Sequence, residues 1–391
     1  MRILFIKKKV LSLLICISLV LSLSACSKKE EAVENAGEVE TNPVEEEVSE
    51  PEAVNEAIED TKEASLEQEE QIEEEPEEVR EGYYRSELTN EWTDEKIKNQ
   101  RPIAVMIDNE KTALPHFGTS RADIVYEMMN STLNDRVTRF MCIIKDYNSL
   151  SQIGSIRSVR TTNLQISPEY NSIVIHDGGP LYINAYFEAP YVEHLSGGFA
   201  RIKNGKPTEF TEYITEGEVV NRCKKEGIDL EYNEYYQGSH WQFAKPNKQT
   251  DLSKRDDSFD ALNIELPYNH NKPKLEYIPE TGVYRYSEYG QEYIDALTDE
   301  HMEFKNVIIQ ESTFTQFDEH GYMNFWIHDN EDMHGYYLTG GKAIPITWAK
   351  DKYDMFPTQF YVADGTMIQM NIGKTYICIV PDDSWDKIVI N

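Results

Sequence analysis

The sequence contains few cysteines and none of the short motifs by which many proteins hold metals or nucleotides. Its 391 residues include five cysteines, and no Cys-x-x-Cys, His-Glu-x-x-His, EF-hand or Walker pattern occurs. The acidic run Asp329-Asn330-Glu331-Asp332 lacks the spacing and the glycine of a calcium-binding loop. We therefore expect no metal and no cofactor.

Basic side chains are also scarce. Lys and Arg number 38 against 70 Asp and Glu, which gives a net charge of −32 at pH 7. A protein of this charge is repelled by phosphate backbones, so we expect no nucleic-acid partner. The imbalance is greatest in residues 27–81, which carry 23 acidic and four basic side chains.

The first residues have the pattern of an export signal. The basic residues Arg2 and Lys7 to Lys9 precede the apolar run Val10 to Leu23, which is shorter than a membrane span. The tetrad Leu23-Ser24-Ala25-Cys26 resembles a bacterial lipobox. The resemblance implies that residues 1–25 are a lipoprotein signal peptide and that Cys26 receives a diacylglyceryl group. An ordinary signal peptide, or an uncleaved anchor that contains a cysteine, is the alternative.

Residues 26–81 are predicted to be a disordered acidic tether, because Glu-rich sequence without aromatic residues cannot bury enough apolar surface to fold. A transient helix around Val54 to Ile72 is the alternative. The three remaining cysteines, Cys142, Cys223 and Cys378, cannot form a complete set of disulfides. Cys142 and Cys378 lie in apolar runs and are predicted to be buried.

The rest of the chain predicts two domains, an α/β mixed domain over residues 82–245 and a mostly antiparallel β domain over residues 261–391. In the first, residues 102–107 read as a buried strand, and residues 161–170 and 181–191 have helical spacing, the second packing over Gly178 and Gly179. In the second, short aromatic-rich runs alternate with turns, and Ala363-Asp364-Gly365-Thr366 is typical of a hairpin. The predicted strands of this domain are 283–286, 306–310, 322–328, 335–338, 344–348, 359–363, 367–371 and 375–380.

Several blocks resemble the YerB-like bacterial lipoproteins. They are Arg101-Pro-Ile-Ala-Val-Met-Ile-Asp-Asn109, Ala122-Asp-Ile-Val-Tyr-Glu127, Ile153-Gly-Ser-Ile-Arg-Ser-Val-Arg160, His176-Asp-Gly-Gly179 and, later, Trp348-Ala-Lys350 and Gly373-Lys-Thr-Tyr376. The resemblance implies a two-domain lipoprotein of Gram-positive type, anchored on the outer face of the cytoplasmic membrane, with no assigned activity. The sequence departs from the family pattern between Glu127 and Thr138 and in the loop from Asn109 to Gly118.

A cluster of cationic residues stands out in this acidic chain. Guanidinium groups bind carboxylate or phosphate in two-pronged fashion, and a Gly-Gly turn lets backbone amides approach the same anion. The predicted anion-binding residues are Arg139, Arg157, Arg160, His176, Gly178 and Gly179, with Asp108 and Asp123 as acidic partners. The alternative is structural: the arginines pair with internal carboxylates such as Asp108, Asp123 or Glu127, and His176 is a core histidine.

Three functional hypotheses follow. The first is an envelope lipoprotein with an arginine-lined cleft for an anion or a partner. The second is an envelope phosphotransferase or hydrolase, because the layout Arg121-Ala-Asp123 and Ser155-Ile-Arg157 is similar to the LytR-CpsA-Psr enzymes, although Ser158 stands where their motif has an aspartate. The third is a module that binds a cell-wall or other envelope protein. Whether the chain is an enzyme stays open, and its catalytic residues are unknown.

Overall fold

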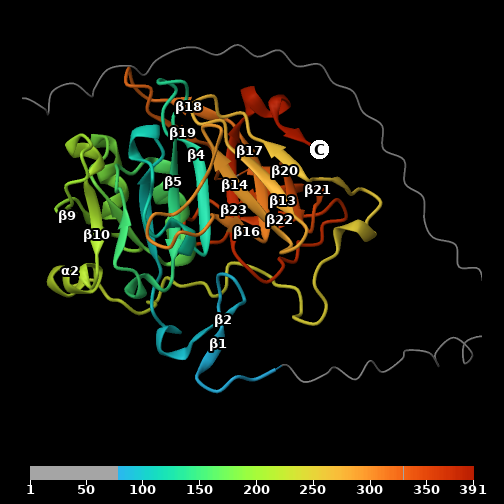
Figure 1. Ribbon diagram of the computed structural model, residues 1–391, viewed down its shortest axis with the longest axis horizontal. Coiled ribbons are helices and arrows are strands. Elements are labelled where there is room, and N and C mark those ends of the chain that lie inside the picture. Colours follow the sequence, from blue (N-terminus) through green and yellow to red (C-terminus); the bar gives the residue numbers. More distant parts are fainter. Residues whose placement is uncertain (1–77, 329) are drawn as a thin grey trace, which may run out of the picture. The chain divides into compact units, whose positions relative to one another are not determined.

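The centre of the protein is a single sheet of eleven strands. The computed structural model describes residues 78–328 and 330–391, which form one compact unit (Figure 1). Ten strands run in the order β11, β21, β20, β17, β23, β4, β5, β3, β7, β8, and β22 pairs with β21. Their bounds are β3 Ile103–Asp108, β4 Ile124–Met129, β5 Thr138–Ile144, β7 Ile173–His176, β8 Glu193–Ser196, β11 Phe259–Asp260, β17 Asn306–Ser312, β20 Asn330–Thr339, β21 Lys342–Lys350, β22 Gln359–Tyr361 and β23 Thr375–Pro381.

Strands from both predicted domains lie side by side in this sheet. β23, near the end of the chain, pairs in parallel with β4 from Thr375 opposite Ile124 to Ile379 opposite Met128. β17 and β23 are also parallel, as are β3, β7 and β8, whereas β5 is antiparallel to both β3 and β4. The two segments therefore share one hydrogen-bonded sheet, and the boundary between the domains stays a prediction.

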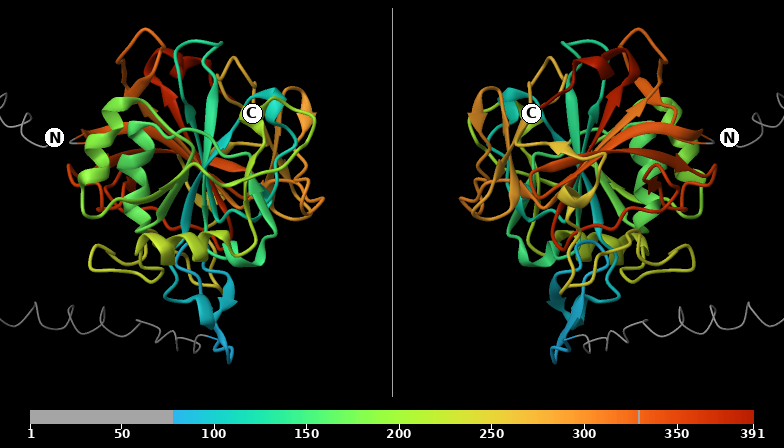
Figure 2. Two further views of the ribbon diagram at one scale, coloured as in Figure 1. Left: turned by 90° about the vertical axis from the view of Figure 1, so that its left-hand side faces the viewer. Right: turned by 90° about the vertical axis from the view of Figure 1, so that its right-hand side faces the viewer.

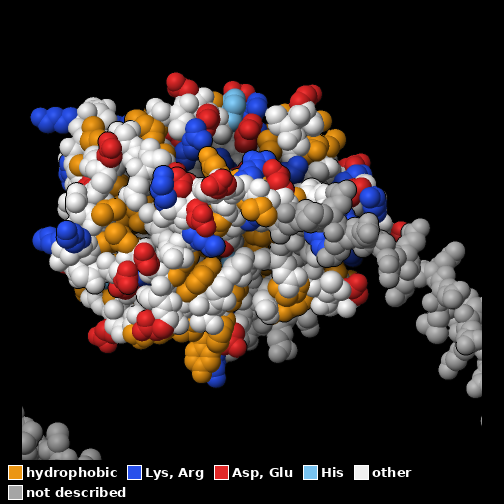
Figure 3. Space-filling model, turned by 90° about the horizontal axis from the view of Figure 1, so that it is seen from below, with side chains coloured by type: hydrophobic (Ala, Val, Ile, Leu, Met, Phe, Trp, Pro, Cys, Tyr) orange, Lys and Arg blue, Asp and Glu red, His pale blue; other side chains and the backbone are white. Residues whose placement is uncertain are grey.

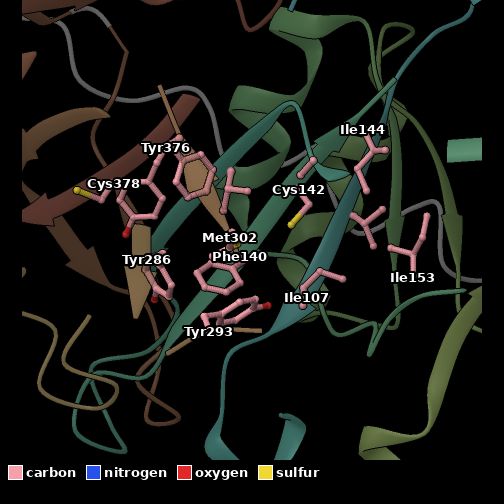
Figure 4. Close-up of a cluster of buried hydrophobic side chains, with 14 of the residues drawn as sticks. Ile107, Phe140, Cys142, Ile144, Ile153, Tyr286, Tyr293, Met302, Tyr376 and Cys378 are labelled. Atoms are coloured by element: carbon pink, nitrogen blue, oxygen red, sulfur yellow. The ribbon is translucent and has the colours of Figure 1, made fainter. Parts of the chain in front are cut away.

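One face of the main sheet is covered by a second, six-stranded sheet. Its order is β15, β14, β13, β12, β24, with β16 paired to β14. Phe140 of β5 contacts Tyr286 of the second sheet edge to face, with ring centroids 5.7 Å apart (Figure 4). The bounds are β12 Asn263–Glu265, β13 Lys274–Ile278, β14 Val283–Glu288, β15 Gln291–Glu292, β16 Glu303–Phe304 and β24 Val389–Ile390.

Short helical segments cover part of the opposite face. The predicted helix at residues 161–170 is confirmed as α1, Thr161–Ile166, followed by the 3-10 segment Ser167–Tyr170. Residues 181–188 form a 3-10 helix, and Ile183 packs so closely on Gly179 that a Cβ there would lie 2.2 Å from the Ile183 side chain. The strands of the sheet are apolar on both sides because both sides are covered; all six residues of β3 are buried.

The remaining elements are small. They are the hairpin β1 Tyr83–Arg85 with β2 Trp92–Asp94, the sheet of β6 Gln152–Gly154, β10 Glu212–Thr215 and β9 Ala200–Arg201, the hairpin β18 Phe314–Gln316 with β19 Met323–Phe325, the helix α2 Glu218–Glu226, and 3-10 turns at Glu95–Ile97, Lys111–Ala113, Thr119–Arg121, Tyr147–Ser149, Thr208–Phe210, Leu252–Lys254 and Asp382–Lys387. Among the described residues, strands therefore greatly outnumber helices. The α/β class of the first domain stays a prediction.

The two hairpins lie at opposite ends of the main sheet. β1 and β2, where the described chain begins, are at one end, and β18 and β19 are at the other (Figures 1 and 2). The connection after β1 is held by the ion pair of Lys145 with Glu87 and by the Gly373 amide, which donates to the Thr89 carbonyl over 2.8 Å. Seen from the side of β1 and β2, the surface mixes acidic, basic and apolar side chains (Figure 3).

Most predicted strands of the second half are found, with one exception. Residues 367–371 make only isolated bridges, at Met367 and Met370, so the strand predicted there is wrong. The predicted turn at residues 363–366 is confirmed, because the Val362 amide donates to the Thr366 carbonyl across it. All three described cysteines are buried and free. No helix in the described part of the chain is long and apolar enough to cross a membrane.

Candidate anion-binding cleft

A cleft of about 330 Å³ lies at the end of the main sheet where β3 and β4 finish and β5 begins. Three arginines line it, together with carboxylates, amides, histidines and one tyrosine. The lining residues are Asp108, Glu110, Asn130, Ser131, Leu133, Asn134, Val137, Arg139, Arg157, Arg160, His270, His320 and Tyr322. Four of the residues predicted from the sequence are therefore brought together here: Asp108, Arg139, Arg157 and Arg160.

Sheet geometry explains why Asp108 and Arg139 meet. Asp108 is the last residue of β3 and stands directly opposite Arg139 of the antiparallel neighbour β5. Directly opposed residues project from the same face of a sheet. Arg157 joins them because its amide donates to the Met106 carbonyl of β3 over 2.9 Å.

Arg157 is neutralised within the protein. Its Nε lies 2.6 Å from the Asp108 carboxylate, and its Nη2 lies 3.1 Å from that of Glu209. The second Asp108 oxygen accepts the Glu110 amide at 2.9 Å. The structural alternative therefore describes the local geometry of this arginine, whose charge is already balanced.

Arg139 forms no such ion pair with a described residue. Its Nη1 donates to the Asn130 side-chain oxygen at 2.8 Å and to the Ser158 carbonyl at 2.7 Å, and no carboxylate of the described residues forms an ion pair with it. The residue is only 6% exposed. Burial, reinforced by the neighbouring Arg160, lowers the pKa of Arg139 to about 9.

Arg160 likewise forms no ion pair with a described residue. Its Nη1 donates to the Val159 carbonyl at 2.9 Å, and its guanidinium lies over the Tyr322 ring, 4.1 Å from the centroid. Burial lowers the pKa of Arg160. Within the described chain neither Arg139 nor Arg160 donates a hydrogen bond from Nη2, and neither of these groups is fully buried. Both arginines therefore keep a donor for a group outside the protein.

The opposite wall of the cleft comes from the turn between β18 and β19. The Thr132 amide donates to the Gly321 carbonyl at 2.9 Å, and the backbones of Ser131 and Tyr322 form an isolated antiparallel β-bridge. Gly321 has a φ of +75°, and a Cβ there would lie 2.6 Å from the Ser131 hydroxyl oxygen, so only glycine suits this position. His320 and Tyr322 thus reach the cleft from a segment that our sequence analysis did not connect with the arginines.

The other predicted site residues do not line the cleft. Asp123 precedes β4 at the far end of the sheet and accepts the Lys145 amide at 2.7 Å, and burial raises its pKa to about 7. His176 Nε2 lies 3.0 Å from His194 Nδ1, and burial lowers the pKa of His176 to about 4. Gly178 contacts His176 through its carbonyl rather than through its amide.

The remaining predictions concern metals and lipid attachment. No group of three or more His, Cys, Asp or Glu side chains positioned to hold a metal ion is found among residues 78–328 and 330–391. Cys26, the predicted lipidation site, the predicted signal peptide at residues 1–25 and all but residues 78–81 of the predicted tether at residues 26–81 lie outside the described residues.

Comparison with known proteins gives a family but no activity. Residues 88–229 match the profile described as "Protein of unknown function (DUF3048) N-terminal domain", and residues 264–377 match the C-terminal domain of the same name. The chain is 25% identical over 304 residues to the "Putative lipoprotein YerB" of Bacillus subtilis (strain 168), covering 76% of this chain and 86% of that protein. The crystal structure of YerB from Bacillus subtilis superposes with a TM-score of 0.66 at 23% identity, covering 79% of this chain and 99% of that one. This last match supports the fold alone.

Proposed function

Because this chain belongs to the family with DUF3048 N- and C-terminal domains and is a homologue of YerB, we propose that it is a lipid-anchored envelope protein whose arginine cleft binds an anionic ligand. The name of the homologue supports a lipoprotein associated with the membrane. The family similarity does not favour the phosphotransferase or hydrolase hypothesis, and the proposal contains no catalytic step.

The anchoring part of the proposal rests on Cys26. A diacylglyceryl group on this residue, followed by removal of residues 1–25, would hold the mature chain on the outer face of the cytoplasmic membrane. Metabolic labelling with a palmitate analogue should mark the wild-type protein and not the variant Cys26→Ser. A wild-type protein that stays unlabelled, or that fractionates with the soluble cell contents, would contradict the proposal.

The binding part rests on one observation: Arg139 and Arg160 are buried cations that form no ion pair with a carboxylate of the described residues. An ion removed from water costs several kcal/mol unless an opposite charge repays it. Arg157 forms ion pairs with Asp108 and Glu209, but the other two arginines form none with a described residue. An anion in the cleft would supply the opposite charge and would receive charge-assisted hydrogen bonds from the free Nη2 groups.

Anion titration of the chain from residue 78 onward tests this proposal, since that part forms one compact unit. Inorganic phosphate and citrate serve as probes in calorimetric titrations. We expect at least one of them to bind, and Arg139→Gln and Arg160→Gln each to weaken binding at least tenfold. Arg201→Gln is the matched control, because Arg201 already pairs with Glu212 at 2.6 Å and does not line the cleft. Equal binding by all four proteins, or binding by none, would refute the cleft.

A further inference from the structure

We infer that the ligand of the cleft is a phosphate monoester carried on a unit the size of one sugar or polyol. This inference rests on the proposed anion binding and names the chemical class of the ligand. It draws on three properties of the cleft, namely its two buried arginines that form no ion pair with a described residue, its size and its polar lining.

The charge balance favours phosphate over carboxylate. Two guanidinium groups, Arg139 and Arg160, form no ion pair within the described chain, although Asp108, the partner of Arg157, also attracts Arg139. A phosphate monoester carries about −1.5 to −2 at neutral pH and has three acceptor oxygens, whereas a single carboxylate carries −1. Glu110 also lines the cleft and Asp318 lies close to Arg160, but both are half-buried and neither forms an ion pair with a described residue. Water screens such partly exposed charges.

The size of the cleft limits the ligand to a small unit. Pockets for small molecules span roughly 300–1,000 Å³, so a volume of about 330 Å³ is at the lower end. Apart from the arginines, the wall offers neutral polar groups such as Ser131 and Asn134 and the partly exposed Leu133. Such a lining suits a hydroxylated unit next to the phosphate.

The same phosphate chemistry is offered by the headgroup of phosphatidic acid. The cleft lies at the opposite end of the main sheet from β1 and β2, where the described chain begins (Figures 1 and 2). Vesicles that contain phosphatidic acid are therefore a separate arm of the test.

The test compares matched ligands by calorimetric titration of the chain from residue 78 onward. Glucose 6-phosphate and glucuronate are of similar size, but one carries a phosphate and the other a carboxylate. We expect glucose 6-phosphate to bind at least tenfold more tightly than glucuronate, and phosphatidic acid vesicles to bind no more than neutral vesicles. Equal binding of the two sugars would overturn the phosphate class while leaving anion binding intact. Capture by the vesicles alone would overturn the sugar or polyol unit, and binding of no ligand would refute the proposed function itself.

Two variants sharpen the result without depending on loss of a buried arginine. Asn130→Asp places a carboxylate of nearly the same shape 2.8 Å from Arg139 Nη1, and we expect at least tenfold weaker binding of glucose 6-phosphate with no loss of thermal stability. Asn148→Asp, exposed and outside the cleft, is the control and should bind as wild type does.

Discussion

Two buried charged clusters in this protein solve the same physical problem differently. Around Glu169, the carboxylate pairs with Lys350 and His240, whereas in the arginine cleft two cations form no ion pair with a described residue. Both clusters are removed from water, where an unpaired charge is costly. A cluster whose charges are paired within the protein serves the structure alone. A cluster whose charges are not paired is stabilised when a ligand of opposite charge binds.

The Glu169 cluster shows what internal balance looks like. Glu169 Oε1 lies 2.8 Å from Lys350 Nζ, and its Oε2 lies 2.6 Å from His240 Nε2. Thr358 adds its amide and its hydroxyl, at 2.8 and 2.9 Å. Burial pushes the pKa of Glu169 upward, but Lys350 and His240 outweigh it and lower the pKa to about 2.

The largest expected effect is the loss of stability that follows when Glu169 is neutralised. Glu169→Gln removes the carboxylate that lies 2.8 Å from Lys350 Nζ, and breaking a buried ion pair costs about 3–5 kcal/mol of unfolding free energy. Because the folded pKa of about 2 lies below the ordinary 4.5, this stability is present above pH 4.5 and is lost as the pH falls toward 2. Urea unfolding at pH 7 and at lower pH measures it. The exposed Glu292→Gln is the control, and a loss below about 1 kcal/mol for Glu169→Gln would break the comparison.

A second effect concerns a carboxyl group that is buried without any cation. Burial and the nearby Glu127 raise the pKa of Glu288 to about 8. Its contribution to stability is therefore complete below pH 4.5 and is lost as the pH rises toward 8. Relative to wild type, Glu288→Gln should gain stability over this range, by at most about 1.4 kcal/mol per pH unit. Urea unfolding at pH 5, 6.5 and 8 measures the trend, and the exposed Glu276→Gln should show none.

A third prediction converts the open cluster toward the balanced one. Asn130→Asp gives Arg139 a carboxylate at the position of the present 2.8 Å hydrogen bond. Hydrogen bonds to charged groups contribute about 1.5–3 kcal/mol to stability, against about 0.5–1.5 kcal/mol for neutral ones. The free energy of unfolding of the variant should therefore be roughly 1 kcal/mol higher than that of the wild type. Urea unfolding at pH 7 gives the value. A variant that is less stable than wild type would show that Arg139 is not short of negative charge.

The smallest expected effect is at the Tyr322 ring. Tyr322→Leu removes the aromatic face beneath Arg160 and should cost about 0.5–1 kcal/mol, the usual size of a partly exposed cation–π contact. Tyr322→Phe keeps the ring and is the matched control, which should unfold as wild type does. If the two variants lose the same amount, the ring does not support Arg160.

The sequence predicted the strands and the arginine cluster better than the walls of the cleft. The run at residues 102–107 reads as a strand because β3 is buried on both faces, and the arginines stand out because the chain is otherwise acidic. His270, His320 and Tyr322 belong to the second half of the chain. Nothing in the spacing of distant residues shows that a turn such as that at Gly321 will close over a loop more than a hundred positions earlier.

Strand direction explains why Asp123 was grouped with the wrong residues. β3 and β4 are both antiparallel to β5, so they run in the same direction. Asp108 ends β3, whereas Asp123 precedes β4, and the two carboxylates therefore lie at opposite ends of the strands of the sheet. His176 ends β7 at the same end of the sheet as Asp108, but its ring turns to His194 of β8. Sequence patterns locate strand ends without telling which ends are neighbours.

The parallel pairing of β4 with β23 has a consequence for any attempt to divide the protein. A fragment that stops after residue 245 would lack β23, and β4, now buried along its whole length, would become an open edge with unsatisfied amides and carbonyls. Edges of this kind recruit other strands and promote aggregation. The N-terminal segment that the family profile recognises as a unit of sequence is thus expected to precipitate when it is expressed by itself, and to regain solubility when the C-terminal segment is supplied in trans.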